Sequence, residues 1–116
     1  MNIKNLYDAT VLTNPCSHNA FLTQVDTTCR TLIAKYGMNY VCVRGDEYAR
    51  ARSVDDTVPV YDDYTPAVMD NVLYLLTGDE SHKVDFINNS DYAYKTVWRR
   101  KSKGKTMKDR RFVDYV

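Results

Sequence analysis

The residues with the clearest chemistry are eight Lys and Arg side chains between positions 99 and 111, in the run RRKSKGKTMKDRR. They make up half of the sixteen basic residues in the chain. Residues 1–98 hold eight basic and thirteen acidic side chains, net −5, whereas residues 99–116 hold eight basic and two acidic, net +6. A basic segment on an acidic body can bind phosphates or the acidic face of another protein.

An apolar end, FVDYV, follows the basic run directly. In a free terminus these side chains would be exposed to water, and an extended segment of this kind can pair with a neighbour's sheet edge or fill its groove. We therefore interpret residues 101–116 as a docking arm that a partner orders. The residues that we assign to partner contact are Arg99, Arg100, Lys101, Lys103, Lys105, Lys108, Arg110, Arg111, Phe112, Val113, Tyr115 and Val116.

Candidates for catalysis or metal binding are few. Neither His18 nor His82 has a carboxylate and a nucleophile close to it in the sequence, and His82 fits a solvated position in the first turn of a helix. Cys16, Cys29 and Cys42 include no close pair, which indicates neither a disulfide framework nor a zinc site; we expect reduced, buried thiols. We predict no catalytic residue, no metal and no cofactor, so the chain is not expected to be an enzyme.

Two acidic pairs stand in the middle of the chain. Asp55 with Asp56, and Asp62 with Asp63, could hold a divalent cation. Aspartate also forms turns by bonding its own backbone. We interpret both pairs as parts of solvated loops.

The N-terminal third of the chain is predicted to be helical. Ile3, Leu6 and Tyr7 recur at helical spacing and predict a short N-terminal helix or docked arm. Ser17 is a plausible N-cap for an amphipathic helix of about 20 residues, which Gly37 ends.

Beyond residue 37 the pattern alternates. The stretch YVCV at 40–43 and the stretch at 48–52 read as two strands around a turn, so we predict a β-hairpin at about 39–60. Pro59 restricts the second half to an edge or extended position.

Two further helices complete the body. Thr65 can cap a helix whose first turn holds Pro66 and which stops at Gly78. The next helix, from about residue 79, is expected to fray between Arg100 and Gly104. Its predicted apolar stripe consists of Val84, Ile87, Asp91, Tyr94 and Trp98, with Phe86, Ala93 and Val97 beside it.

Together these elements predict a mainly α fold: a small bundle of three to four helices with a β-hairpin insertion and an extended C-terminal arm. Residues 1–100 form the helical domain and residues 101–116 the arm. No apolar run approaches the roughly 20 residues that span a bilayer, and the N-terminus lacks the apolar stretch of a signal peptide. We expect a soluble chain that is not exported and has no membrane contact.

Two segments resemble a known family, the head-to-tail connector proteins of tailed bacteriophages, which are small adaptor subunits that ring the underside of the portal. Residues 20–32 resemble the first long helix of that family. Residues 58–68, VPVYDDYTPAV, continuing into 72–76, look like its short extended segment with proline and tyrosine followed by a buried helix. Tyr92, Tyr94 and Trp98 then match the aromatic residues near the end of the following helix.

The resemblance implies a structural virion protein rather than an enzyme. Copies would form a closed ring, usually twelvefold, at the junction of capsid and tail, after synthesis in the host cytoplasm. The expected partners are further copies, the portal protein and downstream tail or ring proteins, and DNA would pass through the lumen without sequence-specific binding. The C-terminal segment would grip the portal or a neighbouring subunit.

A second interpretation is a small nucleic-acid-binding protein whose basic tail neutralises phosphates. Its affinity for DNA would fall steeply with salt. The acidic body would repel the same polyanion, and the apolar end would have no role.

Overall fold

The computed structural model describes the backbone of residues 2–11, 16–45 and 47–113, and the side chains of residues 2–10, 16–45 and 47–102. Its helices are α1 (Ile3–Val11), α2 (His18–Tyr36), α3 (Met38–Val41), α4 (Thr65–Thr77) and α5 (Glu80–Val113), with a 3₁₀ turn, η1, at Asp62–Tyr64. The predicted mainly helical class is therefore confirmed.

Helix ends follow local chemistry. The Ser17 side chain accepts a hydrogen bond from the backbone N–H of Ala20 and caps α2, as predicted. Gly37, at φ 91°, ends α2, and Gly78, in the left-handed region at φ 76°, ends α4. The prediction for Thr65 is wrong: it is already helical, because η1 runs straight into α4 and leaves Tyr64 at the cap position.

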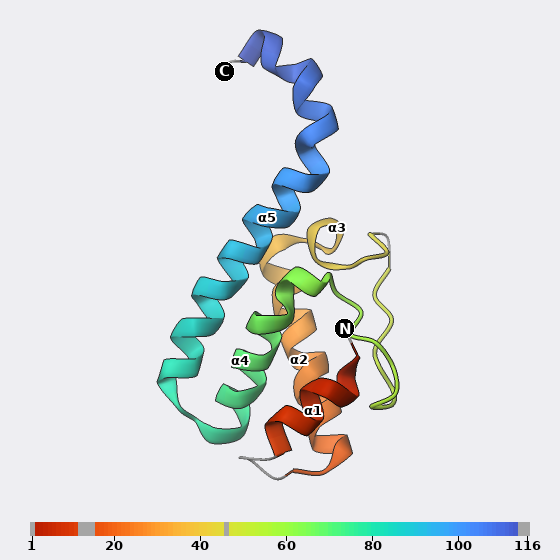
Figure 1. Cartoon of the computed structure of the whole chain (residues 1–116), viewed down its shortest axis with the longest axis vertical. Helices are drawn as coiled ribbons and strands as arrows, with labels where there is room; N and C mark the ends of the chain where they lie inside the picture. The colour runs from red at the N-terminus through yellow and green to blue at the C-terminus, as the bar shows by residue number, and fades with distance from the viewer. Residues whose placement is uncertain (1, 12–15, 46, 114–116) are drawn as a thin grey trace.

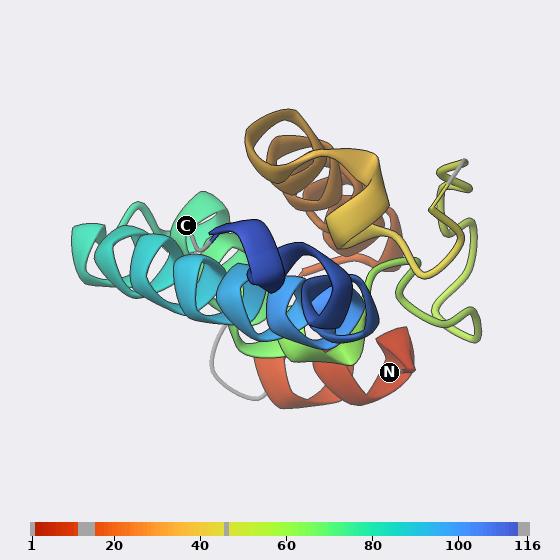
Figure 2. The ribbon, with the colours of Figure 1, turned by 90° about the horizontal axis from the view of Figure 1, so that it is seen from above.

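Helix α4 lies at the centre of the bundle, against α1, α2, η1 and α5 (Figures 1 and 2). Its buried side chains are Ala67, Val68, Asn71 and Val72. The core around them also contains Ile3, Leu6, Phe21, Leu22, Val25, Cys29, Leu32, Val41, Val58, Val60, Tyr64, Phe86, Ala93 and Val97.

The predicted β-hairpin at 39–60 is not supported. Residues 38–41 form α3, because the backbone N–H of Cys42 bonds to the Met38 carbonyl and continues helical geometry past Gly37. The described part of the following loop forms only isolated bridges, between Cys42 and Val60 and between Asn2 and Thr57. The two ends of the loop pair with each other at Cys42 and Val60, and Thr57 pairs with the N-terminal Asn2. The two halves of the loop therefore do not form the hydrogen-bond ladder of a hairpin.

The core-facing stripe of α5 also differs from the prediction. Among the described side chains of this helix, the buried ones are Phe86, Ser90, Ala93 and Val97. The predicted stripe lies beside them, and Val84, Ile87 and Trp98 are 56%, 41% and 45% exposed. Two of the buried residues, Ser90 and Ala93, have small side chains, and α5 packs against α4.

Helix α5 neither frays near residue 100 nor gives way to an extended arm. It continues as a helix through Gly104 to Val113, and Figure 1 shows this last part extending beyond the bundle. The molecule measures 54 × 28 × 20 Å, and the C-terminal end of α5 lies at the opposite end of the long axis from the turn between α4 and α5.

Candidate interaction site

The residues assigned to partner contact all belong to α5 or follow it. Arg99, Arg100 and Lys101 lie on α5, where Arg100 and Lys101 still contact the body of the chain. The backbone of residues 103–113 is helical, but the side chains of Lys103, Lys105, Lys108, Arg110, Arg111, Phe112 and Val113 are outside the described ones, and Tyr115 and Val116 lie outside the described residues altogether.

Arg100 binds the body of its own chain. Its Nη2 donates to Asp63 Oδ1 at 2.7 Å, and its guanidinium carbon lies 5.5 Å from the centre of the Tyr61 ring. The hydrogen bond to Asp63 raises the pKa of Arg100 above its ordinary value. Asp63, which we interpreted as a solvated loop residue, is therefore an anchor for the basic segment.

Lys101 makes a second anchor one residue later. Its Nζ donates to the Asn39 carbonyl at 2.6 Å and lies 5.9 Å and 5.6 Å from the ring centres of Tyr40 and Tyr61. The root of the basic segment, Arg100 and Lys101, is thus attached to α3, to Tyr61 and to Asp63 in η1. Since both anchors are only partly buried, each contributes modestly to stability, and together they fix the direction in which α5 leaves the bundle.

A cluster of tyrosines lies next to this root. The rings of Tyr36 and Tyr94 stack with centres 4.7 Å apart, and the Tyr64 hydroxyl donates to the Tyr40 carbonyl at 2.9 Å. The Tyr36 hydroxyl donates to Asp91, and this bond, helped by the charge of Lys35, lowers the pKa of the Asp91 carboxyl. The cluster joins α2, α3 and α5, so much of the tyrosine content serves internal packing.

Beside the root, Tyr94, Lys95, Trp98 and Arg99 line a hollow of about 250 Å³. Trp98, the sole tryptophan of the chain, is half exposed there. Exposed aromatic and cationic side chains in one place are typical of protein contact surfaces.

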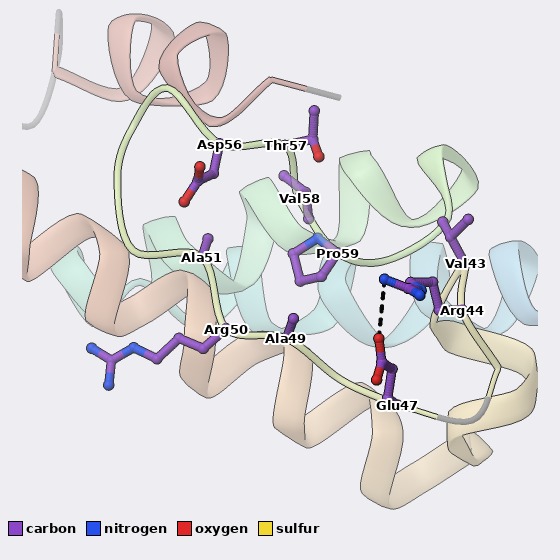
Figure 3. A pocket seen from close by; sticks show the side chains of 10 residues that line it. All are labelled: Val43, Arg44, Glu47, Ala49, Arg50, Ala51, Asp56, Thr57, Val58 and Pro59. Carbon is purple, nitrogen blue, oxygen red and sulfur yellow. Dashed lines mark ion pairs between the residues drawn. The ribbon is translucent and has the colours of Figure 1, made fainter.

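A second hollow, of about 420 Å³, lies within the loop 43–59 (Figure 3). Arg44 and Glu47 form an ion pair at 3.1 Å across one side of it. The Asp56 carboxylate is engaged by the backbone N–H groups of Arg52 and Ser53. Two alanines, two valines and a proline form most of the rest of the lining, together with Arg50 and Thr57.

One group of side chains has the composition of a cation site. Asp70 on α4 and His82 and Asp85 on α5 have ligand atoms within 4.8 Å of one another. Asn89 Nδ2 donates to Asp70 Oδ2 at 2.6 Å and holds that carboxylate in place. His82, interpreted as solvated, is half-buried within this group.

The anchoring residues Asn39, Tyr40, Tyr61 and Asp63 were not predicted. Each lies at least 37 residues from its partner in the chain, and no spacing rule connects such distant positions. The only signal was the opposite charge of Asp63 and Arg100.

None of the helices in the described part of the chain has an apolar stretch that could span a lipid bilayer. Comparison of the chain with models of known protein families, with curated proteins and with solved structures finds no match.

Proposed function

We propose that this chain is a structural subunit that assembles with copies of itself into a closed ring, as a head-to-tail connector of a tailed bacteriophage. The observation that carries the proposal is the separation of charge along α5. Its first half carries three acidic residues, Glu80, Asp85 and Asp91, against two lysines, whereas eight basic and two acidic residues follow from Arg99 onward. Opposite charges at the two ends of a subunit favour contact between unlike faces, and such contacts generate rings when the rotation between subunits closes.

Three further features support assembly rather than catalysis. The basic end of α5 extends out of the bundle, where it can reach another molecule (Figure 1). Large apolar side chains stay exposed on α5 itself. In the hollow of the loop 43–59, Arg44 is paired with Glu47, and the Asp56 carboxylate is bonded to backbone N–H groups.

The portal-adaptor role follows from the resemblance in sequence. In such a ring the acidic bodies would surround the DNA channel, and an acidic wall keeps DNA from adhering as it passes. The C-terminal segment would link each subunit to its neighbour or to the portal, so the location is the junction of capsid and tail.

The test is sedimentation velocity of the purified chain at increasing concentration, with negative-stain images of the largest species. We expect oligomers at about 0.1 M salt that dissociate at about 1 M salt, because the Debye length falls from about 10 Å to about 3 Å. A chain truncated after Ser102 keeps both anchors and should remain monomeric. As a matched control, replacing Lys103, Lys105 and Lys108 by arginine should preserve assembly, whereas replacing them by glutamine should weaken it.

The same experiment separates the nucleic-acid alternative. If the chain stays monomeric at every concentration, alone and with a portal protein, the connector proposal is wrong. Salt-sensitive DNA binding by that monomer, lost on truncation after Ser102, would then identify a nucleic-acid-binding protein.

A further inference from the structure

Three large apolar side chains are exposed on either side of the turn between α4 and α5. Leu75 lies on the last turns of α4, and Val84 and Ile87 lie on the first turns of α5; they are 38%, 56% and 41% exposed. Farther along the same stripe of α5, Tyr94 stacks on Tyr36 of α2. We call Leu75, Val84 and Ile87, with the flanking acidic residues Asp79, Glu80 and Asp85, the α4–α5 patch.

The surroundings of the patch are strongly acidic. Residues 70–91 contain five acidic side chains and a single basic one, Lys83. The Lys83 ammonium lies 5.8 Å from the centre of the Tyr74 ring. Asp79 accepts hydrogen bonds from the backbone N–H and hydroxyl of Ser81, which lower the pKa of its carboxyl, so this charge persists at neutral pH.

The C-terminal segment has the complementary composition. Its eight basic residues are followed directly by apolar residues in the sequence FVDYV. Acidic side chains around exposed aliphatic ones would match basic residues that precede an apolar end. The patch thus offers both kinds of contact to this segment.

The segment cannot reach the patch of its own chain. Helix α5 is continuous from Glu80 to Val113, about 50 Å at 1.5 Å per residue, and the patch lies at its beginning. Figure 1 shows the two regions at opposite ends of the molecule. Any contact between them must join two different copies.

The loop with residues 53–63 is also acidic, but two of its carboxylates, those of Asp56 and Asp63, already have partners in the same chain. Asp63 binds Arg100 of the same chain, and Asp56 binds backbone N–H groups of its own loop. The described side chains make no ion pair with Glu80 or Asp85. The patch is therefore the better acceptor for a basic segment.

We propose that the α4–α5 patch binds the basic C-terminal segment of a second copy of this chain. The inference rests on the proposed assembly and names its contact. Because the donor is one end of α5 and the acceptor is the other, every subunit can donate and accept at the same time, which gives a heterologous, head-to-tail interface.

The experiment measures binding of a fluorescein-labelled peptide of residues 99–116 to the full-length chain by fluorescence anisotropy at about 0.1 M salt. Two variants test the acceptor: Val84→Ser with Ile87→Ser, and Glu80→Gln with Asp85→Asn. Both pairs are exposed, so the fold should persist, and circular dichroism checks this. Asp8→Asn with Asp55→Asn is the matched control, because it removes the same charge from exposed sites elsewhere.

We expect each patch variant to weaken peptide binding by about tenfold or more and the control to leave it within about twofold. Equal binding by patch variants and control would overturn the inference, and so would binding of the peptide to duplex DNA but not to the chain. If the full-length chain still forms rings while the patch variants bind the peptide normally, the acceptor lies elsewhere and the proposed function stands. If neither rings nor peptide binding occur, both proposals fail.

Discussion

The hydrogen bond between Asn71 and Thr28 gives a sharp test of how α2 and α4 are held together. Asn71 Nδ2 donates to Thr28 Oγ1 at 2.8 Å, and the same hydroxyl donates to the Gln24 carbonyl at 2.8 Å. Both side chains are buried. Thr28→Val keeps the shape but leaves the Asn71 amide without the acceptor that the described residues provide, which should cost about 2 kcal/mol of unfolding free energy.

The reverse change should be milder. Asn71→Leu leaves the Thr28 hydroxyl bonded to Gln24 and adds apolar burial, so its cost should stay below about 1 kcal/mol. The double variant should be close to wild type, because no donor is then left buried without a partner. Thr31→Val is the control: Thr31 also bonds the carbonyl four residues earlier, but it is exposed, and its replacement should change stability by less than about 0.5 kcal/mol.

Urea unfolding followed by circular dichroism, at several protein concentrations, measures these differences. With a denaturant dependence of about 1–3 kcal/mol/M, Thr28→Val should lower the midpoint by roughly 1 M. If Asn71→Leu costs as much as Thr28→Val, or if the double variant is no better than Thr28→Val, the buried hydrogen bond does not govern this contact.

Three other predictions concern single residues. Gly78→Ala should lower stability by about 1 kcal/mol through backbone strain alone, because φ is 76° and an added Cβ would meet no atom within 4 Å; the urea midpoint measures it. The pKa of the Asp91 carboxyl is lowered in the folded chain, so its contribution to stability is present above about pH 4 and is lost as the pH falls through the folded-state pKa. In acid titrations, Asp91→Asn should therefore show a shallower loss of stability than wild type between about pH 5 and pH 2. Burial raises the pKa of Cys29 to about 12 and also raises the pKa of Cys42, whereas Cys16 is half exposed. A disulfide reagent should therefore modify Cys16 first in the folded chain. Rapid modification of Cys29 would contradict the packing.

The helix ends could be predicted because their signals are local. A serine whose side chain reaches the third N–H, a proline in a first turn and a glycine at positive φ each act within a few residues. These signals located α2 and the start and end of α4 to within about one residue.

The stripe of α5 and the hairpin could not be predicted, since tertiary contacts decide both. Helix α5 offers two stripes, and hydrophobicity favours the one with Val84 and Ile87, but the folded chain buries the one with Ser90 and Ala93. The alternating residues at 40–43 suit a strand, yet burial of Val41 and the bond from the Tyr64 hydroxyl to the Tyr40 carbonyl stabilise α3 there.

The candidate site, like the fold, could be predicted only in part. Charge separation between the body and residues 99–116 is visible in the sequence, so the segment itself could be singled out. Its anchoring by Asp63 and Asn39 could not, because that depends on where α5 passes over α3 and η1.

The continuity of α5 has a consequence for the size of any assembly. If both contacts of a subunit lie on one stiff helix, the length and twist of that helix set the angle and the distance between neighbouring subunits. Inserting a single residue after Ser102 would turn the distal segment by about 100° and move it by about 1.5 Å. The number of subunits that close a ring would then be encoded in the length of one secondary-structure element, and altering that length would change the symmetry while leaving both contact surfaces intact.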